Sequence, residues 1–139
     1  IYRLIPYNIR HAVEHANSVS FALPFTVTES PQKALSGICG ITAHEFWHVW
    51  NVKRLRPEAL WTYKYDELPY SEQHWFSEGV TNYYADLLMI RAGLIDEENF
   101  LGRMARVIST VENSYPATQI SPAQSSYDSW LDTSPYKDP

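Results

Sequence analysis

The sequence has a single cysteine and no apolar run as long as a membrane-spanning helix. Because Cys39 has no second thiol to pair with, no internal disulfide holds the chain together. A transmembrane helix needs about 20 consecutive apolar residues, so a membrane span is excluded. No signal peptide is visible, and the chain begins at Ile1 rather than Met, as a piece of a longer protein would. The compartment, cytoplasmic or periplasmic, therefore stays open.

The chain also lacks a large excess of charge of one sign. Its 11 Lys and Arg and 16 Asp and Glu give a net charge of -5, and the cations are scattered except in the segment 53–56. No basic surface for nucleic acid is indicated. We interpret Lys53, Arg54 and Arg56 as capping the end of a helix and forming ion pairs, in preference to binding an anionic partner.

Apolar residues, in contrast, are abundant. They make up 45% of the 139 residues, and aromatic residues make up 14%. This composition excludes intrinsic disorder, and the length suffices for a single domain with a core of its own. We therefore expect one globular domain over residues 1–139, with further domains of a parent chain as its partners.

The segment His44-Glu45-Phe46-Trp47-His48 has the pattern H-E-x-x-H. On a helix, residues four apart lie one above the other, so His44 and His48 can both reach one Zn²⁺. Glu45 then lies close to a metal-bound water without being a ligand, as the general base of a zinc peptidase does. The alternative is a pair of core histidines satisfied by hydrogen bonds.

The residues around this motif predict a buried helix over about 37–54. Apolar residues almost encircle it, and no proline lies between Pro31 and Pro57. Pro57 disfavours a helical conformation at Arg56 and ends the element.

A catalytic zinc needs a third protein ligand, and Glu78 is the strongest candidate. It lies among apolar residues in a predicted helix over about 71–92, which begins with Ser71 as a cap and ends before Gly93. Asn82, one turn beyond, and Asp86, two turns beyond, are candidates for orienting a ligand. The alternative is that Glu78 is a surface acid on an amphipathic helix.

The remaining sequence predicts an α+β fold that is predominantly helical. Short β-type patches occur at Tyr2–Ile5 and Ser18–Leu23. Asp96 is placed to cap a helix over about 97–114, and a short helix is predicted over 122–131. The stripe of apolar residues on the 97–114 helix is expected to be core; it consists of Phe100, Met104, Val107, Ile108 and Val111.

These motifs resemble the M61 peptidases, the glycyl aminopeptidase family. The segment His44–Pro57 is similar to the metal-binding helix of that family, and Trp75–Tyr84 is similar to its glutamate helix. The segments Leu88–Glu98, Ser125–Trp130 and Val13–Ser18 also match. The resemblance covers nearly the whole chain.

The resemblance implies a thermolysin-like zincin catalytic domain, with short N-terminal strands packed on a helical bundle. It implies His44, His48 and Glu78 as zinc ligands, Glu45 as the catalytic acid and base, and a peptide as the substrate. The product would be a free N-terminal amino acid, often Gly or Ala. The β-rich N-terminal domain and the PDZ-like domain of the family are not evident in this chain.

Two positions depart from the family pattern. The family has two glycines where His11 and Ala12 stand, just before Glu14. In related aminopeptidases a Glu on that edge strand holds the amino group of the substrate, and Glu14 is the candidate for this role. The family's likely oxyanion-stabilising Tyr lies beyond the end of this chain.

Two functions follow. The first is a zinc aminopeptidase that uses a metal-activated water and Glu45 as general base. Its oxyanion could be assisted by any of five side chains, namely His15, Tyr63, His74, Tyr83 and Tyr84. The alternative is a non-catalytic, zinc-stabilised scaffold or interaction domain.

Overall fold

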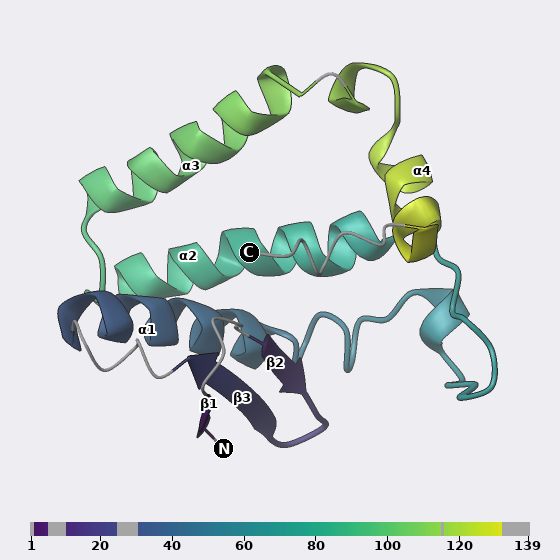
Figure 1. The fold of residues 1–139 in the computed structure, drawn as a ribbon, viewed down its shortest axis with the longest axis horizontal. Coiled ribbons are helices and arrows are strands. Elements are labelled where there is room, and N and C mark those ends of the chain that lie inside the picture. The colour runs from purple at the N-terminus through teal and green to yellow at the C-terminus, as the bar shows by residue number, and fades with distance from the viewer. Residues whose placement is uncertain (1, 6–10, 25–30, 115, 132–139) are drawn as a thin grey trace.

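The computed structural model describes residues 2–5, 11–24, 31–114 and 116–131 (Figure 1). Within them a small sheet precedes a set of helices, which confirms the predicted α+β, mainly helical class. The elements are β1 (Tyr2–Ile5), β2 (His11–Glu14), β3 (Val19–Pro24), α1 (Pro31–Trp47), η2 (Glu58–Leu60), η3 (Phe76–Val80), α2 (Thr81–Arg91), α3 (Glu97–Glu112), η4 (Pro116–Thr118), α4 (Pro122–Tyr127) and η5 (Asp128–Leu131).

The sheet has the strand order β1-β3-β2, so β2 is an edge strand. β1 runs parallel to β3, whereas β2 runs antiparallel to it, with Glu14 opposite Val19. Phe21 and Leu23 alternate along β3 toward the core and are almost fully buried. The sheet lies under α1 (Figure 1), and β2 contacts that helix. The two predicted β patches are thus confirmed, and the sheet gains a third strand that carries Glu14.

Helix α1 begins and ends earlier than predicted. It starts at Pro31, where the missing N–H costs nothing in the first helical turn, and ends at Trp47 instead of residue 54. Beyond Trp47 the chain continues in turns whose backbone hydrogen bonds no longer keep the regular α-helical spacing. The carbonyl of His48, for example, accepts from the N–H groups of both Val52 and Lys53. The basic cluster therefore does not lie in the last turn of the helix, and that part of its interpretation is wrong.

The prediction that this helix is buried on all sides is also wrong. Phe46 is 52% exposed and Trp50, just beyond the helix, is 45% exposed. Glu45 and His48, in contrast, are buried. The polar side chains of the motif thus face the interior. Part of the apolar surface of the motif is exposed to solvent among the residues that the structure describes.

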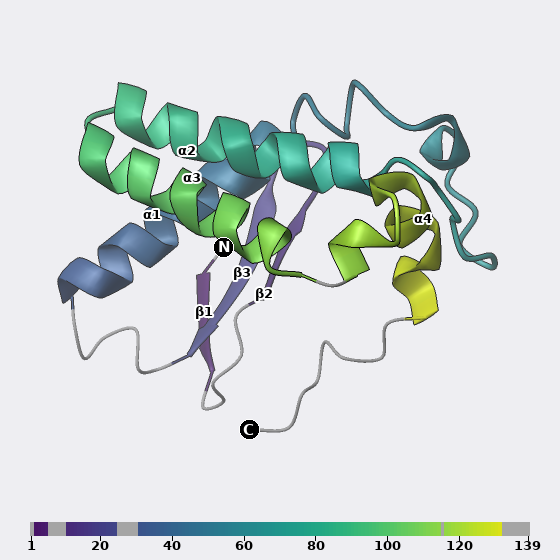
Figure 2. The same ribbon diagram turned by 90° about the horizontal axis from the view of Figure 1, so that it is seen from above.

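Helix α2 packs against α1 through residues four apart (Figures 1 and 2). Ser77, Thr81, Ala85 and Met89 are all buried, and this spacing places them on one face. A Cβ at Gly40 of α1 would lie 3.7 Å from the Met89 sulfur, so the two helices approach closely there.

The predicted C-terminal end of this helix agrees with the structure, whereas the predicted start near residue 71 is wrong. The Ser71 hydroxyl accepts from the N–H of Gln73 at 3.1 Å, but η3 begins only at Phe76 and α2 at Thr81. Gly93 adopts φ 70°, the left-handed conformation that commonly ends a helix.

Helix α3 begins as predicted, since the Asp96 carboxylate accepts from the N–H of Asn99. The expectation that its apolar stripe is core is wrong for its second half. Val107, Ile108 and Val111 are each more than half exposed. The cause is that α3 contacts α2 near its own start, where Phe100 meets Tyr83, and then diverges from α2 (Figure 1).

The short C-terminal helix forms as α4 followed by η5. Ser121 caps α4 by accepting from the N–H of Gln124. The Ser126 hydroxyl accepts from the N–H of Trp75 at 2.9 Å, which attaches α4 to the start of the helix that carries Glu78. Among the described residues, no helix is long and apolar enough to cross a membrane.

Candidate metal centre

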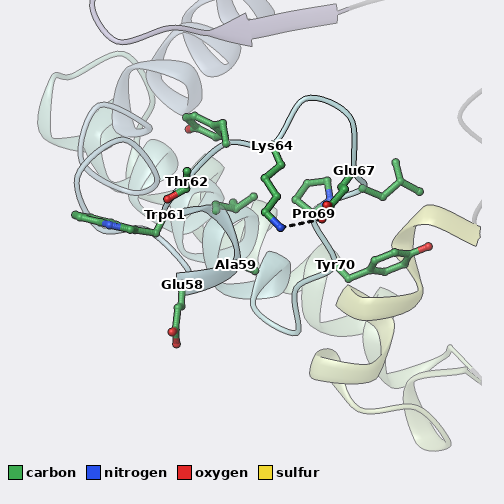
Figure 3. Close-up of a pocket in the computed structure, with 11 residues that line it drawn as sticks. Glu58, Ala59, Trp61, Thr62, Lys64, Glu67, Pro69 and Tyr70 are labelled. Atoms are coloured by element: carbon green, nitrogen blue, oxygen red, sulfur yellow. Dashed lines mark hydrogen bonds and ion pairs between the residues drawn. The ribbon is translucent and has the colours of Figure 1, made fainter.

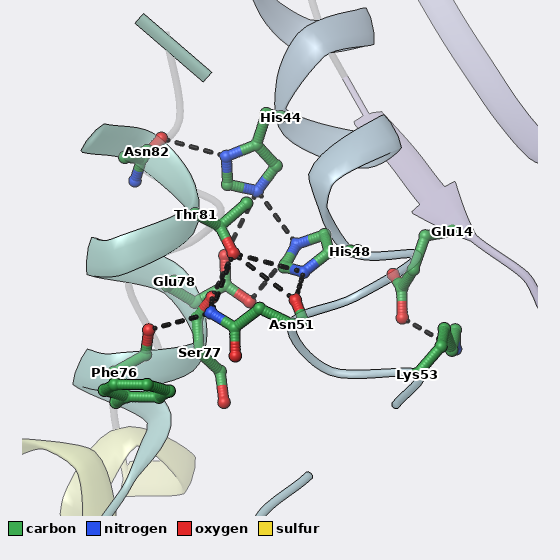
Figure 4. A network of polar contacts seen from close by, with 10 residues as sticks. All are labelled: Glu14, His44, His48, Asn51, Lys53, Phe76, Ser77, Glu78, Thr81 and Asn82. Atoms are coloured by element: carbon green, nitrogen blue, oxygen red, sulfur yellow. Dashed lines mark hydrogen bonds and ion pairs between the residues drawn. The ribbon is translucent and has the colours of Figure 1, made fainter. Parts of the chain in front are cut away.

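Three of the predicted side chains meet between the end of α1 and η3 (Figure 4). The Nε2 atoms of His44 and His48 lie 3.1 Å apart. The Glu78 carboxylate lies 3.2 Å from Nε2 of His44 through one oxygen and 3.7 Å from Nε2 of His48 through the other. One ligand atom from each of the three residues falls within 4.8 Å of the other two.

The outer nitrogen of each imidazole is held by an oxygen. Nδ1 of His48 lies 2.7 Å from the carbonyl oxygen of Asn51, and Nδ1 of His44 lies 2.9 Å from Oδ1 of Asn82. Carbonyl oxygens only accept, so in the neutral imidazoles the proton is on Nδ1. Both Nε2 lone pairs then face the Glu78 carboxylate and each other.

This donor set fits zinc. Ligand atoms at 2.0–2.1 Å around a tetrahedral metal lie about 3.4 Å from one another. The three separations of 3.1, 3.2 and 3.7 Å bracket that value. Three unprotonated or anionic donors that converge in this way need a cation among them. Two imidazoles and one carboxylate also leave the fourth position open, as in catalytic sites.

A π-helical turn places Glu78. η3 spans Phe76–Val80, and such turns occur frequently at functional sites because they re-aim side chains. Asn51 satisfies the carbonyls of this turn, since its Nδ2 lies 3.2 Å from the oxygens of both Phe76 and Ser77. Nδ2 also lies 3.2 Å from the hydroxyl of Thr81.

Asn51 is a candidate site residue that the sequence reasoning missed. It is 3% exposed, its backbone carbonyl holds His48, and its side chain holds the turn that carries Glu78. It therefore connects two of the three candidate ligands. A signal was available, since Asn51 stands three residues after His48 in an apolar stretch, where a polar residue needs a specific partner.

The two residues proposed to orient a ligand differ in their contacts. Asn82 touches His44, as described above. Asp86 instead binds Arg103 of α3, with 2.8 Å between the carboxylate and Nη1. Both residues line a cavity of about 480 Å³ that also contains His44 and Glu45. The structure thus brings Asn82 to the histidine, whereas Asp86 ties α3 to α2 at the edge of the site.

Glu45 lies inside the cluster. It is 7% exposed, and its carboxylate comes within 4.8 Å of ligand atoms of His48 and Glu14. Burial raises the pKa of Glu45 above its ordinary value, and the neighbouring histidines partly oppose this shift. A carboxyl with a raised pKa is better suited to accept and return a proton near neutral pH than a solvated one.

The electrostatics couple His44 to Glu78. The hydrogen bond from Glu78 raises the pKa of His44, although burial opposes it. The same hydrogen bond lowers the pKa of Glu78, again against the effect of burial. Each group therefore stabilises the charged form of the other.

Glu14 reaches the site from the edge strand β2. Its carboxylate lies 2.8 Å from the Lys53 ammonium (Figure 4). Glu14, Lys53 and Glu78 line a common cavity of about 370 Å³. The site thus has a carboxylate at one side that already binds an amine.

The five side chains considered for the oxyanion lie in three places. Tyr63 and His74 line the cavity that contains Glu78. Tyr84 is stacked on Trp47, with ring centroids 4.4 Å apart, and Tyr83 packs on it. His15 lines a different cavity, beside Lys53. The structure therefore places two of the five, Tyr63 and His74, on the Glu78 side.

A further cavity of about 520 Å³ lies within the loop 58–70 (Figure 3). The ion pair between Lys64 and Glu67 crosses it at 3.1 Å. None of the three candidate metal ligands lines it, and neither does Glu45, although Tyr63 lines both this cavity and the one that contains Glu78.

The chain matches known proteins over most of its length. It is similar to the crystal structure of an aminopeptidase N family protein from Idiomarina loihiensis, with 30% sequence identity and a TM-score of 0.84. That match covers 94% of this chain and 23% of the other, so the chain spans about a quarter of its structural neighbour. No curated protein sequence matches. The family model of the M61 glycyl aminopeptidases matches residues 37–138. This chain therefore belongs to the M61 glycyl aminopeptidase family.

Proposed function

We propose that this protein is a zinc-dependent aminopeptidase that removes the N-terminal residue of peptides. The observation that carries the proposal is the convergence of three donor atoms from His44, His48 and Glu78 beside a buried Glu45. A structural zinc site needs no carboxylate at the position of Glu45 and is closed by a fourth protein ligand. Family membership and the aminopeptidase neighbour support the same reaction class.

His44, His48 and Glu78 would hold the zinc, in the manner of thermolysin-like peptidases. Zinc there supplies Lewis acidity, which polarises the scissile carbonyl and lowers the pKa of a bound water toward about 7. Glu45 accepts the proton of the attacking water and then donates it to the leaving amine. Asn82 and the carbonyl of Asn51 keep the two imidazoles in the tautomer that presents Nε2.

Glu14 would bind the amino group of the substrate. Its carboxylate faces the same cavity as Glu78 and holds an ammonium group, that of Lys53, at 2.8 Å. A substrate ammonium at this position would compete with Lys53 for the carboxylate. This arrangement favours an exopeptidase over an endopeptidase, which would have no reason to place an amine binder beside the reacting centre.

The test is turnover of alanyl and glycyl anilides by the parent protein and by Glu45→Gln. We expect zinc at one equivalent in both proteins and a loss of turnover of about 10²- to 10⁴-fold in the variant, because proton transfer loses its base. Glu112→Gln, at the exposed end of α3, is the matched control and should retain full activity. Zinc at one equivalent without turnover sensitive to Glu45 would instead indicate the non-catalytic scaffold.

A second comparison tests the exopeptidase assignment. Glu14→Ala should weaken the hydrolysis of substrates with a free amino group far more than that of N-acetylated ones. Equal losses on the two kinds of substrate would remove the argument for an aminopeptidase. The remainder of the parent chain is proposed to supply further domains, since the match spans only 23% of the neighbour.

A further inference from the structure

The basic segment after α1 lines a cavity beside the proposed amine-binding carboxylate. This cavity has a volume of about 450 Å³, in the range of small-ligand sites. Its lining consists of His15, Ala16, Lys53, Arg54, Arg56 and Tyr63. Three cationic side chains and an imidazole thus surround one hollow, and no carboxylate lines it.

The guanidinium groups here are not neutralised by acids. Among the described residues, Lys53 pairs with Glu14, whereas neither Arg54 nor Arg56 has a carboxylate partner. Arg54 donates through Nη1 to the carbonyl of Val49, which leaves its second amino group and Nε without a described acceptor. A planar guanidinium with free donors is the protein group best matched to a carboxylate.

Arg56 fixes the backbone on one side of the cavity. It donates to four backbone carbonyls, those of Val52, Lys53, Leu60 and Trp61. It also lies 4.7 Å from the centre of the Tyr63 ring. These contacts hold the loop after η2 against the segment that carries Arg54, so the cavity is preformed.

The cavity adjoins the cavity that contains Glu14 and Glu78, because Lys53 and Tyr63 line both. Carboxylates therefore lie on one side of Lys53, and cations lie on the other. An acidic amino acid at the start of a peptide has the complementary layout, with a main-chain α-ammonium group and a carboxylate at the end of a short side chain.

We propose that the cavity beside Lys53 binds the side-chain carboxylate of an N-terminal Glu or Asp, through Arg54 and His15. The proposal rests on the proposed function, since it takes Glu14 as the group that holds the substrate amine. It makes Arg54 a specificity-determining residue. The enzyme then prefers an acidic first residue to a neutral one of the same shape.

The test compares glutamyl and glutaminyl anilides, which differ by charge alone, together with the calorimetric binding of L-glutamate and L-glutamine. The wild type should favour glutamate in both measurements by about tenfold, the effect of one charge-assisted hydrogen bond. Arg54→Gln should abolish this preference, because it lowers glutamyl turnover and glutamate binding by about tenfold more than the glutaminyl values. Arg54→Lys should retain part of it, and Arg106→Gln, on the exposed side of α3, is the matched control.

Two outcomes separate this proposal from the proposed function. Glutamate binding that is about tenfold tighter without turnover of any anilide contradicts the aminopeptidase assignment and supports the anion site. Equal binding of the two amino acids by the wild type, or a preference that persists in Arg54→Gln, overturns the anion site. If Arg54→Gln fails to fold, His15→Gln supplies the same comparison, with a reduced preference expected.

Discussion

The Nε2 atoms of His44 and His48 face each other at 3.1 Å, while the Nδ1 atom of each ring is held by an oxygen acceptor. In the neutral imidazoles, this arrangement directs two lone pairs toward one point. A proton or a metal ion must lie between them for the contact to be favourable. The Glu78 carboxylate completes the arrangement and favours positive charge there. A metal ion bound at this position would therefore have to compete with protons.

The first prediction concerns the metal-free protein and its dependence on pH. The pKa of Glu78 is lowered from its ordinary value of 4.5, so its contribution to stability is present above pH 4.5 and is lost as pH falls through the lowered value. The pKa of His44 is raised from 6.5, so its contribution is present below pH 6.5 and is lost as pH rises through the raised value. The pair should therefore stabilise the fold most between those limits.

The measurement is the melting temperature of chelator-treated wild type and Glu78→Gln across pH 4 to 9. The gap between the two proteins should be widest between pH 4.5 and 6.5 and should narrow toward pH 9. A gap that keeps growing above neutral pH would contradict the coupling between the two groups.

The second prediction concerns Asn51. Asn51→Ala removes the side chain that bonds two carbonyls of η3, so the π-helical turn should lose support, at a cost of about 1–3 kcal/mol in the free energy of unfolding. Glu78 should then lie less well aimed at His48, and zinc affinity should fall. Chemical denaturation and zinc competition titration measure the two effects. Asn99→Ala, on the exposed side of α3, should change neither. An unaltered zinc affinity in Asn51→Ala would exclude the proposed link.

The third prediction concerns Asn82. Asn82→Ala removes the acceptor that orients His44, so zinc affinity should fall by about 10- to 100-fold, with little effect on stability because the residue is exposed. Asn82→Asp retains an acceptor and should retain most of the affinity. Asn99→Ala on α3 is the control. Equal affinities of Asn82→Ala and wild type would show that His44 needs no such partner.

The fourth prediction concerns where the core lies. Met89 is 1% exposed between α1 and α2, so Met89→Ala should cost about 2–5 kcal/mol in the free energy of unfolding. Val107 is 58% exposed on α3, so Val107→Ala should cost no more than about 0.5 kcal/mol. Denaturant unfolding compares them. A cost at Val107 close to that at Met89 would mean that another part of the protein covers this face of α3.

Much of the site follows from local sequence, because residues four apart on a helix share a face. That rule brought His44 beside His48 and placed Asn82 one turn beyond Glu78. The sequence motifs also predicted the start of α3, because the cap by Asp96 is a local interaction.

The remainder depends on contacts between distant segments. Helix α1 ends at Trp47 because the following turns are held by tertiary bonds, such as those from Asn51 to η3 and from Lys53 to Glu14. The π-helical turn leaves no local signature, since its carbonyls are satisfied by a residue 25 positions earlier. Exposure of the apolar stripe on α3 could not be predicted either, because periodicity identifies an apolar face and does not say what covers it.

Zinc titration of the chelator-treated protein tests the central claim most directly. The account predicts one equivalent of tightly bound zinc in the wild type and a loss of affinity of at least about 100-fold in His48→Ala and in Glu78→Gln. Glu72→Gln, an exposed acid before the same helix, should bind zinc as the wild type does. A wild type that binds no zinc, or variants at residues 48 and 78 that bind it undiminished, would contradict the proposed metal centre.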